Sequence, residues 1–361
     1  MRILLRLLVL GCAGATSLAL AGNAVAKTQL LVSGATDIGA SATTIVEVKG
    51  ATEDAASAQV SIYVPSGYTA NLSQAATTQI GTVSARAQLL EINADAVLDV
   101  TGTILVADRN DPSLGSGAMQ CTGTPTHAAI WLLRLVVSGQ TVNVPVYVDP
   151  TSGAEATFSS AKFVLCLPQP YAKTRPTYSP LGTKIIDANM MLSAGVLTNP
   201  TSAGTHVWRT VVTPWGVNGA TPNLAGTMEA QGIVTIPSSL SLKGNLRTIR
   251  HKKRGRTTVA NSVLLSGKLL EKFQGVSGAK VAFFANGKSA GTVTTGSTGA
   301  FAKTVGLRKK TLYKATATVP TRETSCVSPL PATAAPAGCV SATQAGYRIS
   351  SNSVIVSPKT R

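Results

Sequence analysis

The chain has 361 residues, of which 44% are hydrophobic but only 4% aromatic and 13% charged, and its formal net charge is +17. This length gives room for two or three domains, and the scarcity of charged residues argues against long amphipathic helices with a charged face. The many small and turn-forming residues instead favour short strands joined by tight turns.

The start of the chain, residues 1–26, resembles a secretory signal peptide. Arg2 and Arg6 supply a positive start, residues 7–20 form an apolar stretch, and residues 24–26 (Ala-Val-Ala) form a cleavage site of small residues. Because such a segment is removed on export, we expect cleavage after Ala26 and a protein that is secreted or associated with the cell envelope.

Two alternatives to a cleaved signal peptide are open. An uncleaved membrane anchor needs about 20 predominantly apolar residues, and glycine, serine and threonine interrupt this stretch. Lipid attachment at Cys12 is the second alternative, but the apolar run before it is short and contains a break at Arg6. Later in the chain the densest apolar run, residues 130–137, is too short to span a membrane and contains Arg134.

The region that follows shows repeated alternation of apolar and polar residues, the period of a β-strand. Residues 60–64 and 142–148 alternate in this way, and the second run pairs with the apolar run 127–137 through a Ser-Gly-Gln turn as a predicted hairpin. Further strands are expected at 43–49, 96–107, 162–167, 184–192, 206–213 and 228–236.

These patterns predict an all-β fold, a β-sandwich, for residues 27–235. The proline-rich stretch 168–182 is either a long surface loop or a boundary between two sub-domains, so the region forms one large domain or two.

Removal of the signal peptide leaves four cysteines, Cys121, Cys166, Cys326 and Cys339. In an oxidising compartment an even number indicates disulfides, and three pairings are possible. We favour Cys121–Cys166 with Cys326–Cys339, because each bond then stays within one domain; each would contribute about 3–4 kcal/mol. A four-cysteine metal site is the alternative, but no C-x₂-C spacing is present. We expect no metal and no other cofactor.

Charge is distributed very unevenly along the chain. Residues 27–235 hold ten Lys/Arg against thirteen Asp/Glu, a net of −3, whereas residues 236–361 hold twenty Lys/Arg against two acids, Glu271 and Glu323, a net of +18. A segment with this charge concentrates anions around it. The asymmetry therefore predicts an anionic partner for the last third of the chain.

The last third is predicted to form a basic linker, residues 236–257, and a sandwich of about seven short strands, residues 258–361. The clearest signal is a hairpin over residues 279–294 with an Asn286-Gly287 turn, since both central residues of such a turn need a positive φ. Other strands are expected at 262–270, 300–305, 311–319 and 353–357.

Three short runs in this region carry a family resemblance. The runs Leu-Ser-Gly-Lys at 265–268, Gly-Val-Ser-Gly-Ala-Lys-Val at 275–281 and Thr-Gly-Ser-Thr-Gly-Ala-Phe at 295–301 resemble bacterial Ig-like (carboxypeptidase-regulatory-like) modules. The resemblance covers about residues 258–357 and implies an Ig-like sandwich that serves as a spacer or binding module on an exported bacterial protein, not an activity. This sequence departs from those modules in its high positive charge and in its lack of acidic turn residues.

The candidate site for an anionic polymer consists of the basic run between residues 247 and 256 and a second cluster at 308–310. Its members are Arg247, Arg250, Lys252, Lys253, Arg254, Arg256, Arg308, Lys309 and Lys310. The predicted partner is an anionic cell-wall polymer or an acidic polysaccharide, because ammonium and guanidinium groups attract phosphate and carboxylate groups. No sequence-specific nucleic-acid motif is present. The alternative is a structural or protein–protein module whose charge serves only solubility.

Signals for catalysis are weak. The histidines are His127, His206 and His251, and the chain contains neither a G-x-S-x-G nor an H-E-x-x-H motif. We therefore predict a non-catalytic protein. The alternative, a hydrolase of unfamiliar type, requires His127 or His206 to lie beside a carboxylate and a nucleophile.

Two further motifs have a structural and a functional interpretation. Residues 108–111 (Asp-Arg-Asn-Asp) resemble the start of a calcium loop, but Pro112 follows and the later glutamate is missing, which favours a turn. Trp215 follows a predicted strand, and is either a packed loop anchor, which we favour, or an exposed ring that stacks on a sugar.

Overall fold

The computed structural model describes residues 28–90, 93–137, 139–170, 183–216, 219, 221–253, 256–327 and 340–359. Nearly every element in these ranges is a strand, so the predicted all-β class is confirmed. The helical elements of the described residues are α1 (Pro112–Thr122) and two short 3₁₀ turns, η1 (Glu155–Thr157) and η2 (Leu224–Gly226). The predicted signal peptide lies outside the described residues.

The strands follow one another with short connections. The first two thirds of the chain contain β1 (Gln29–Ser33), β2 (Thr44–Lys49), β3 (Ser57–Pro65), β4 (Thr69–Ala70), β5 (Gln79–Leu89), β6 (Asn93–Val106), β7 (Ala129–Val137), β8 (Gln140–Pro150), β9 (Ser159–Cys166), β10 (Thr183–Leu192), β11 (Leu197–Thr198), β12 (Gly204–Pro214) and β13 (Met228–Ile236). The last third contains β14 (Ser238–Leu240), β15 (Lys243–Lys253), β16 (Arg256–Glu271), β17 (Gln274–Gly275), β18 (Lys280–Ala285), β19 (Lys288–Thr294), β20 (Ala300–Gly306), β21 (Thr311–Val319), β22 (Arg322–Val327), β23 (Val340–Gln344), β24 (Tyr347–Ser350) and β25 (Val354–Val356).

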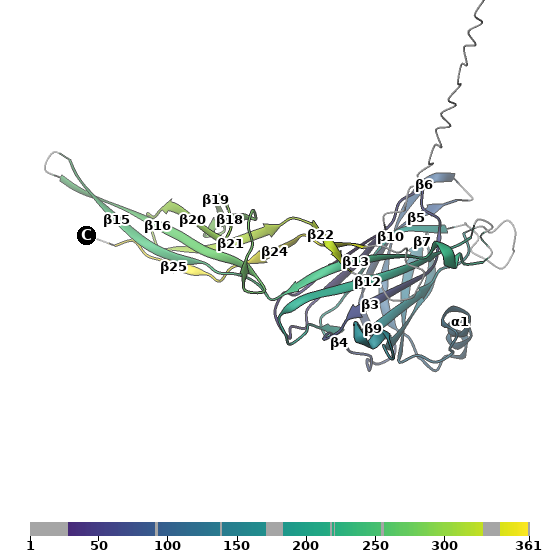
Figure 1. Cartoon of the computed structure of the whole chain (residues 1–361). Coiled ribbons are helices and arrows are strands. Elements are labelled where there is room, and N and C mark those ends of the chain that lie inside the picture. The colour runs from purple at the N-terminus through teal and green to yellow at the C-terminus, as the bar shows by residue number, and fades with distance from the viewer. Residues whose placement is uncertain are drawn as a thin grey trace, which may run out of the picture.

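One 13-stranded sheet dominates the N-terminal region, in the order β1-β2-β10-β5-β6-β7-β8-β9-β3-β12-β13-β23-β22. The sheet curls over (Figure 1), and β1 lies against β13, so closely that a Cβ placed on Gly232 would be 2.9 Å from the carbonyl oxygen of Leu30. The curled sheet encloses a core that includes Trp131, Phe163 and Trp208. The predicted hairpin of β7 and β8 is confirmed, with Leu133 opposite Val144.

Helix α1 packs on the outer face of this sheet. Its N-cap is Asp111, whose side chain accepts a hydrogen bond from the Ser113 backbone N–H at 2.9 Å, and Pro112 occupies the first turn. Gly123 ends the helix in the left-handed conformation with φ 79°. Ala118 is fully buried beside Tyr147 of β8. Residues 108–111 therefore form a turn, as favoured over a calcium loop from the sequence, and this turn leads into a helix.

The last third forms a module of two sheets around its own core. One sheet has the order β14-β16-β15, with β17 and β20 also paired to β16; the other has the order β19-β18-β21-β24, with β25 paired to β21. Leu265, Phe283, Phe301 and Tyr313 lie in the core between them. The predicted Asn-Gly turn joins β18 and β19, with φ values of 48° at Asn286 and 78° at Gly287.

Two features differ from the expected division of this region. Residues 236–257, the predicted basic linker, include β14 and β15, and β15 pairs with β16 from Lys243↔Ser266 to Lys253↔Arg256. The strands β22 and β23 leave the module and extend the N-terminal sheet, where β23 runs parallel to β13. Backbone pairing explains both, since strand edges offer hydrogen bonds whatever the side-chain charge.

The segment 168–182 mostly lies outside the described residues. The strand before it, β9, and the strand after it, β10, belong to the same sheet and the same core.

Candidate functional site

The predicted basic run lies on a two-stranded hairpin at the far end of the module (Figure 1). β15 and β16 continue past the sandwich, and their register ends at Lys253↔Arg256. The side chains of Arg247 and Arg250 are exposed. Of the other members, Lys252, Lys253 and Arg256 have described backbone only, and Arg254 lies outside the described residues.

The second basic cluster, Arg308 to Lys310, meets the base of this hairpin. Arg247 of β15, Ser262 of β16 and Gly306 of β20 lie in one row across three strands, which places the following loop beside the hairpin. The Leu307 N–H donates to the Asn261 carbonyl at 2.9 Å. We call the hairpin residues 247–256, together with residues 308–310, the distal basic end.

Lys359 also lies at this end, which the sequence did not predict. The Asn261 side chain donates to the carbonyl oxygen of Lys359 at 3.2 Å, and the Lys359 side chain is exposed. Segments far apart in sequence therefore contribute cations to one end of the module. The predicted site already joined residues 247–256 with residues 308–310, and Lys359 was missed because it lies far from both along the chain.

A further row of cations crosses the outer face of the β18-β21-β24 sheet. Lys280 lies opposite Thr318, which lies opposite Arg348, and both cationic side chains are exposed. Arg348 was not among the predicted site residues. Its position between the apolar residues Tyr347 and Ile349 nevertheless indicates a strand in which Arg348 faces outward.

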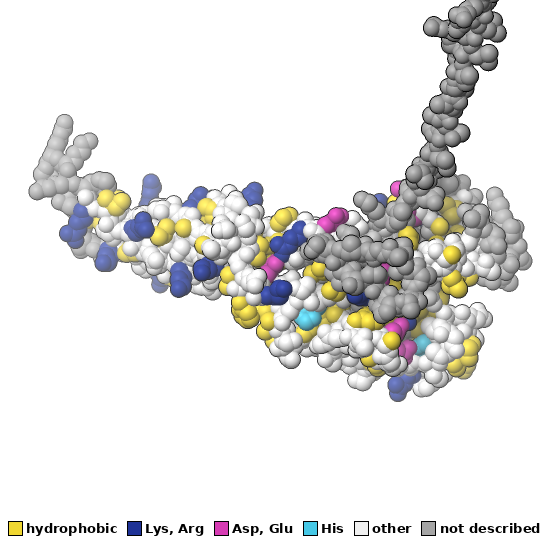
Figure 2. All heavy atoms as spheres, in the orientation of Figure 1, with side chains coloured by type: hydrophobic (Ala, Val, Ile, Leu, Met, Phe, Trp, Pro, Cys, Tyr) yellow, Lys and Arg dark blue, Asp and Glu magenta, His cyan; other side chains and the backbone are white. Residues whose placement is uncertain are grey.

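Acidic side chains do not offset these cations. Glu271 is only 11% exposed and accepts bonds from Arg322, from the Gln344 amide at 3.1 Å and from the Tyr347 hydroxyl at 2.5 Å. Burial, with this bond to Glu271, raises the pKa of Tyr347. Within the described part of residues 236–361, Arg322–Glu271 is the one ion pair. Figure 2 shows the result: dark blue side chains are scattered along the module, whereas magenta ones lie at its junction with the N-terminal region and beyond.

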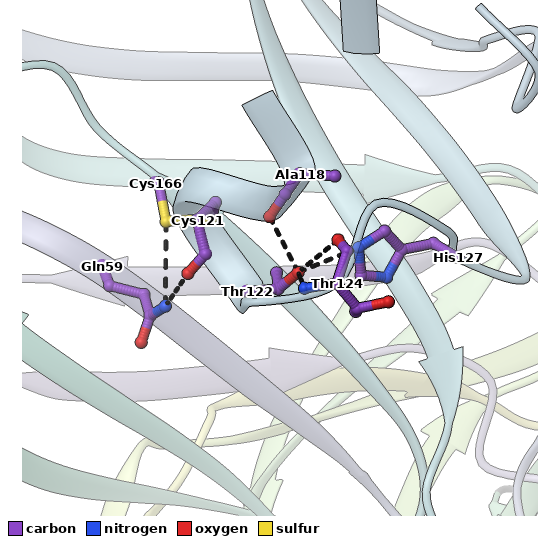
Figure 3. The surroundings of a disulfide bond; sticks show 7 residues. All are labelled: Gln59, Ala118, Cys121, Thr122, Thr124, His127 and Cys166. Atoms are coloured by element: carbon purple, nitrogen blue, oxygen red, sulfur yellow. Dashed lines mark hydrogen bonds between the residues drawn. A yellow bond between two sulfur atoms is a disulfide. The ribbon is translucent and has the colours of Figure 1, made fainter. Parts of the chain in front are cut away.

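His127 does have the neighbours that a hydrolase would require. Its Nδ1 lies 2.5 Å from the Asp149 carboxylate. Figure 3 shows the other side of the ring, where Nε2 lies 3.0 Å from the Thr122 hydroxyl. The Thr122 oxygen also contacts the carbonyl oxygens of Ala118, at 2.9 Å, and of Thr124, at 3.1 Å.

Burial and bonding give this cluster a structural role. The His127 side chain is 1% exposed, and the second Asp149 oxygen accepts the Ala128 N–H at 2.8 Å. Thr122 is the last residue of α1, so the cluster ties the helix end to β8. The other histidine considered, His206, packs edge-on against Tyr68 with ring centroids 5.7 Å apart, and burial lowers its pKa.

The disulfide lies beside this cluster (Figure 3). Cys121 and Cys166 are bonded, as predicted, and join α1 to the end of β9. The Gln59 side chain of β3 donates to the Cys121 carbonyl at 2.9 Å. Cys339 and the side chain of Cys326 lie outside the described residues, so their pairing stays a prediction.

The interior of the curled sheet holds a small apolar cavity of about 110 Å³. Val46, Leu133 and Met190 are among its lining residues. Binding sites for small molecules usually measure roughly 300–1,000 Å³. This cavity is smaller than that range, so we interpret it as a packing void.

No model of a known protein family matches this chain, and no curated protein is similar to it. In the part of the chain that the structure describes, neither α1 nor the 3₁₀ turns are long and apolar enough to cross a membrane.

Proposed function

We propose that this protein is an exported, non-catalytic binding protein whose cationic C-terminal module associates with anionic polymers of the cell envelope. The observation that carries the proposal is the distal basic end, where Arg247, Arg250 and residues 308–310 are brought together on one exposed end of the module. The two acids of residues 236–361 both lie at the opposite end of the module: Glu271 is bonded to Arg322 and Tyr347, and Glu323 lies on β22, which extends the N-terminal sheet.

The geometry suits a polymer better than a small anion. The exposed cations lie on a protruding hairpin and an adjacent loop rather than around an enclosed pocket. A repeating phosphate or carboxylate chain can contact several such groups at once, and their summed potential increases its local concentration. Because exposed charges are screened by salt, the association is expected to weaken steeply as ionic strength rises.

The test compares two variants of the mature protein with equal charge. The first changes Arg247, Arg250, Lys309 and Lys310 to glutamine; the matched control changes Lys268, Lys272, Lys280 and Arg348 to glutamine, which are also exposed cations of the module. Co-sedimentation with isolated cell walls and with poly(glycerol phosphate) is measured at low and at high salt. We expect the first variant to lose binding at least about tenfold more than the control, and salt to release the wild-type protein.

Three results would count against the proposal. Equal retention of the wild-type protein at low and high salt excludes electrostatic attachment. Equal losses in the two variants exclude the distal basic end as the binding site. Unchanged binding in both variants supports the alternative, a structural or protein–protein module whose charge serves only solubility.

A hydrolase is the second candidate, because Asp149, His127 and Thr122 lie within hydrogen-bond reach of one another. Hydrolysis of ester substrates by the wild-type protein that disappears in Thr122→Val and His127→Ala would favour it over the binding protein proposed above. Against it stand the 1% exposure of the His127 side chain and the internal bonds of Thr122.

A further inference from the structure

A groove of about 550 Å³ lies on the outer face of the large sheet, between α1 and the segment after β12. Its floor crosses β8, β9, β3 and β12, which are neighbours in the sheet. Cys166, Gln59 and Thr213 lie in one row across the last three of these strands. Since strands are about 4.8 Å apart, four of them give the groove a length of about 14 Å. Its volume falls within the range of ligand sites, roughly 300–1,000 Å³.

The described lining residues are apolar for the larger part, with several polar side chains and no charged one among them. The amides of Gln120 on α1 and Asn143 on β8 are exposed at its edge. An amide both donates and accepts hydrogen bonds, which matches the double role of a hydroxyl group. Since none of the described lining residues is Lys, Arg, Asp or Glu, the lining favours a neutral ligand, in contrast to the cationic module.

Flat apolar surfaces complete the groove. Trp215, Pro145 and Pro222 line it together with Leu224, which is 71% exposed. Val142, 45% exposed, lies at the β8 side. A contiguous exposed apolar surface that is rimmed by polar groups is typical of an interaction site.

Trp215 supplies an independent observation. Its indole Nε1 is buried, and no acceptor reaches it among the described residues. A buried donor without a partner costs about 1–3 kcal/mol, so such groups call for an acceptor from outside the chain or a specific role. The N–H belongs to the residue whose ring lines the groove.

From these features we infer that the groove binds a short segment of a neutral oligosaccharide. Sugar hydroxyls would bond to the amides of Gln120 and Asn143, and the apolar C–H face of a sugar ring would pack on the Trp215 indole, whose shape combines an apolar body with a polar N–H. A polyanion is not favoured here, because the described lining residues include no cation and residues 27–235 carry a net charge of −3. The inference is independent of the function proposed for the C-terminal module.

The test titrates the full mature protein with three neutral probes, maltoheptaose, cellopentaose and fully acetylated chitopentaose, by calorimetry and by tryptophan fluorescence. We expect saturable binding of at least one probe with equal affinity at low and high salt. This salt independence separates the groove from the distal basic end, whose binding falls with salt.

Variants locate the binding. Trp215→Ala is expected to weaken binding at least about tenfold, and the double variant Gln120→Ala/Asn143→Ala, which changes only exposed side chains, provides a test that does not depend on the folding of the Trp215 segment. Phe273→Ala and Gln274→Ala, exposed positions in the other module, are the matched controls and should bind like the wild-type protein.

Failure of all three probes to bind, or equal binding by the double variant and the wild-type protein, would overturn the inference. Decaproline is added as a fourth probe, since aromatic grooves also bind extended proline-rich peptides. Binding of decaproline that Trp215→Ala abolishes, with no binding of the sugars, would reassign the groove to a peptide ligand.

Discussion

At the scale of single residues, the two acids of the cationic module have opposite environments. Glu271 is 11% exposed and bonded to Arg322, Gln344 and Tyr347, whereas Glu323 is exposed. Arg322 and Gln344 belong to β22 and β23, the strands that extend the N-terminal sheet. Glu271 therefore connects the module to that sheet.

These two acids form a matched pair for mutagenesis. Glu271→Gln should lower the free energy of unfolding by about 1–3 kcal/mol, because it leaves a partly buried guanidinium without its charged acceptor. Glu323→Gln removes the same charge at an exposed position and should change stability by less than about 0.5 kcal/mol. Urea unfolding followed by circular dichroism measures both. Equal effects of the two substitutions would contradict the role assigned to Glu271.

Sequence reasoning found some of these residues and missed others for a clear reason. Cys121 and Cys166 were paired correctly, because four cysteines allow few pairings and two of the possible bonds stay within one domain. The partners of His127 were missed although the predicted hairpin brings Asp149 back beside it, because the predicted strand ended one residue earlier, at Val148. The other partner, Thr122, ends a helix that was not predicted. For Trp215 the sequence left two interpretations, a packed anchor, which was favoured, and a ring that stacks on a sugar. The groove around it could not be found, because its other residues come from four strands, a helix and two connecting segments.

At the scale of elements, sequence reasoning missed the helix α1 and several strands, among them β1, β5, β15, β22, β23 and β24. The helix is the more informative case. Its interior contains Gly115 and Gly117, which lower helix propensity. Its ends nevertheless carry good signals, with Asp111 as N-cap, Pro112 in the first turn and Gly123 at the C-terminal end. The helix is held in place by packing of Ala118, by the His127 cluster and by the disulfide.

Removal of the disulfide tests how strongly α1 depends on it. The bond joins residues 45 apart, and a loop of this size corresponds to a loss of about 2–4 kcal/mol when the bond is removed. The double variant Cys121→Ala/Cys166→Ala should lose this amount in urea unfolding while it keeps its β-sheet circular dichroism. A loss below about 0.5 kcal/mol would show that packing and the His127 cluster suffice to hold the helix.

The hairpin of β15 and β16 is the element for which the structure differs most from the sequence-based expectation. Its run of basic residues predicted a solvated linker, since charged blocks are often disordered. In the structure β15 pairs with β16 along its whole length. Backbone hydrogen bonds to a long partner strand, anchored by Val263 and Leu265 in the module core, permit basic residues on its free end.

At the scale of the whole molecule, the two parts share one sheet. β22 and β23 come from the C-terminal third, yet β23 pairs with β13 at Gly232↔Thr343. The module therefore extends from the N-terminal region as a continuation of its backbone pairing (Figure 1). This arrangement presents the distal basic end away from the N-terminal region.

Shared backbone pairing predicts that the two parts unfold together. Trp208→Ala in the N-terminal core and Phe301→Ala in the module core should each shift the same single transition in differential scanning calorimetry, by the cost of a large core truncation, about 3–5 kcal/mol. Two separate transitions, each moved by only one of the substitutions, would show that the β13–β23 pairing does not couple the parts.

The sequence by itself determined the β-rich class, one disulfide, the Asn-Gly hairpin and the concentration of positive charge in the last third. These follow from local periodicity, from turn chemistry and from composition, which need no knowledge of distant neighbours. Only the tertiary structure decided that β22 and β23 join the N-terminal sheet, that separate basic segments meet at one end, and that α1, β8 and Trp215 form an uncharged groove. Each of these depends on pairing between strands far apart in the chain, and the side-chain pattern of a strand does not specify which distant strand it will meet.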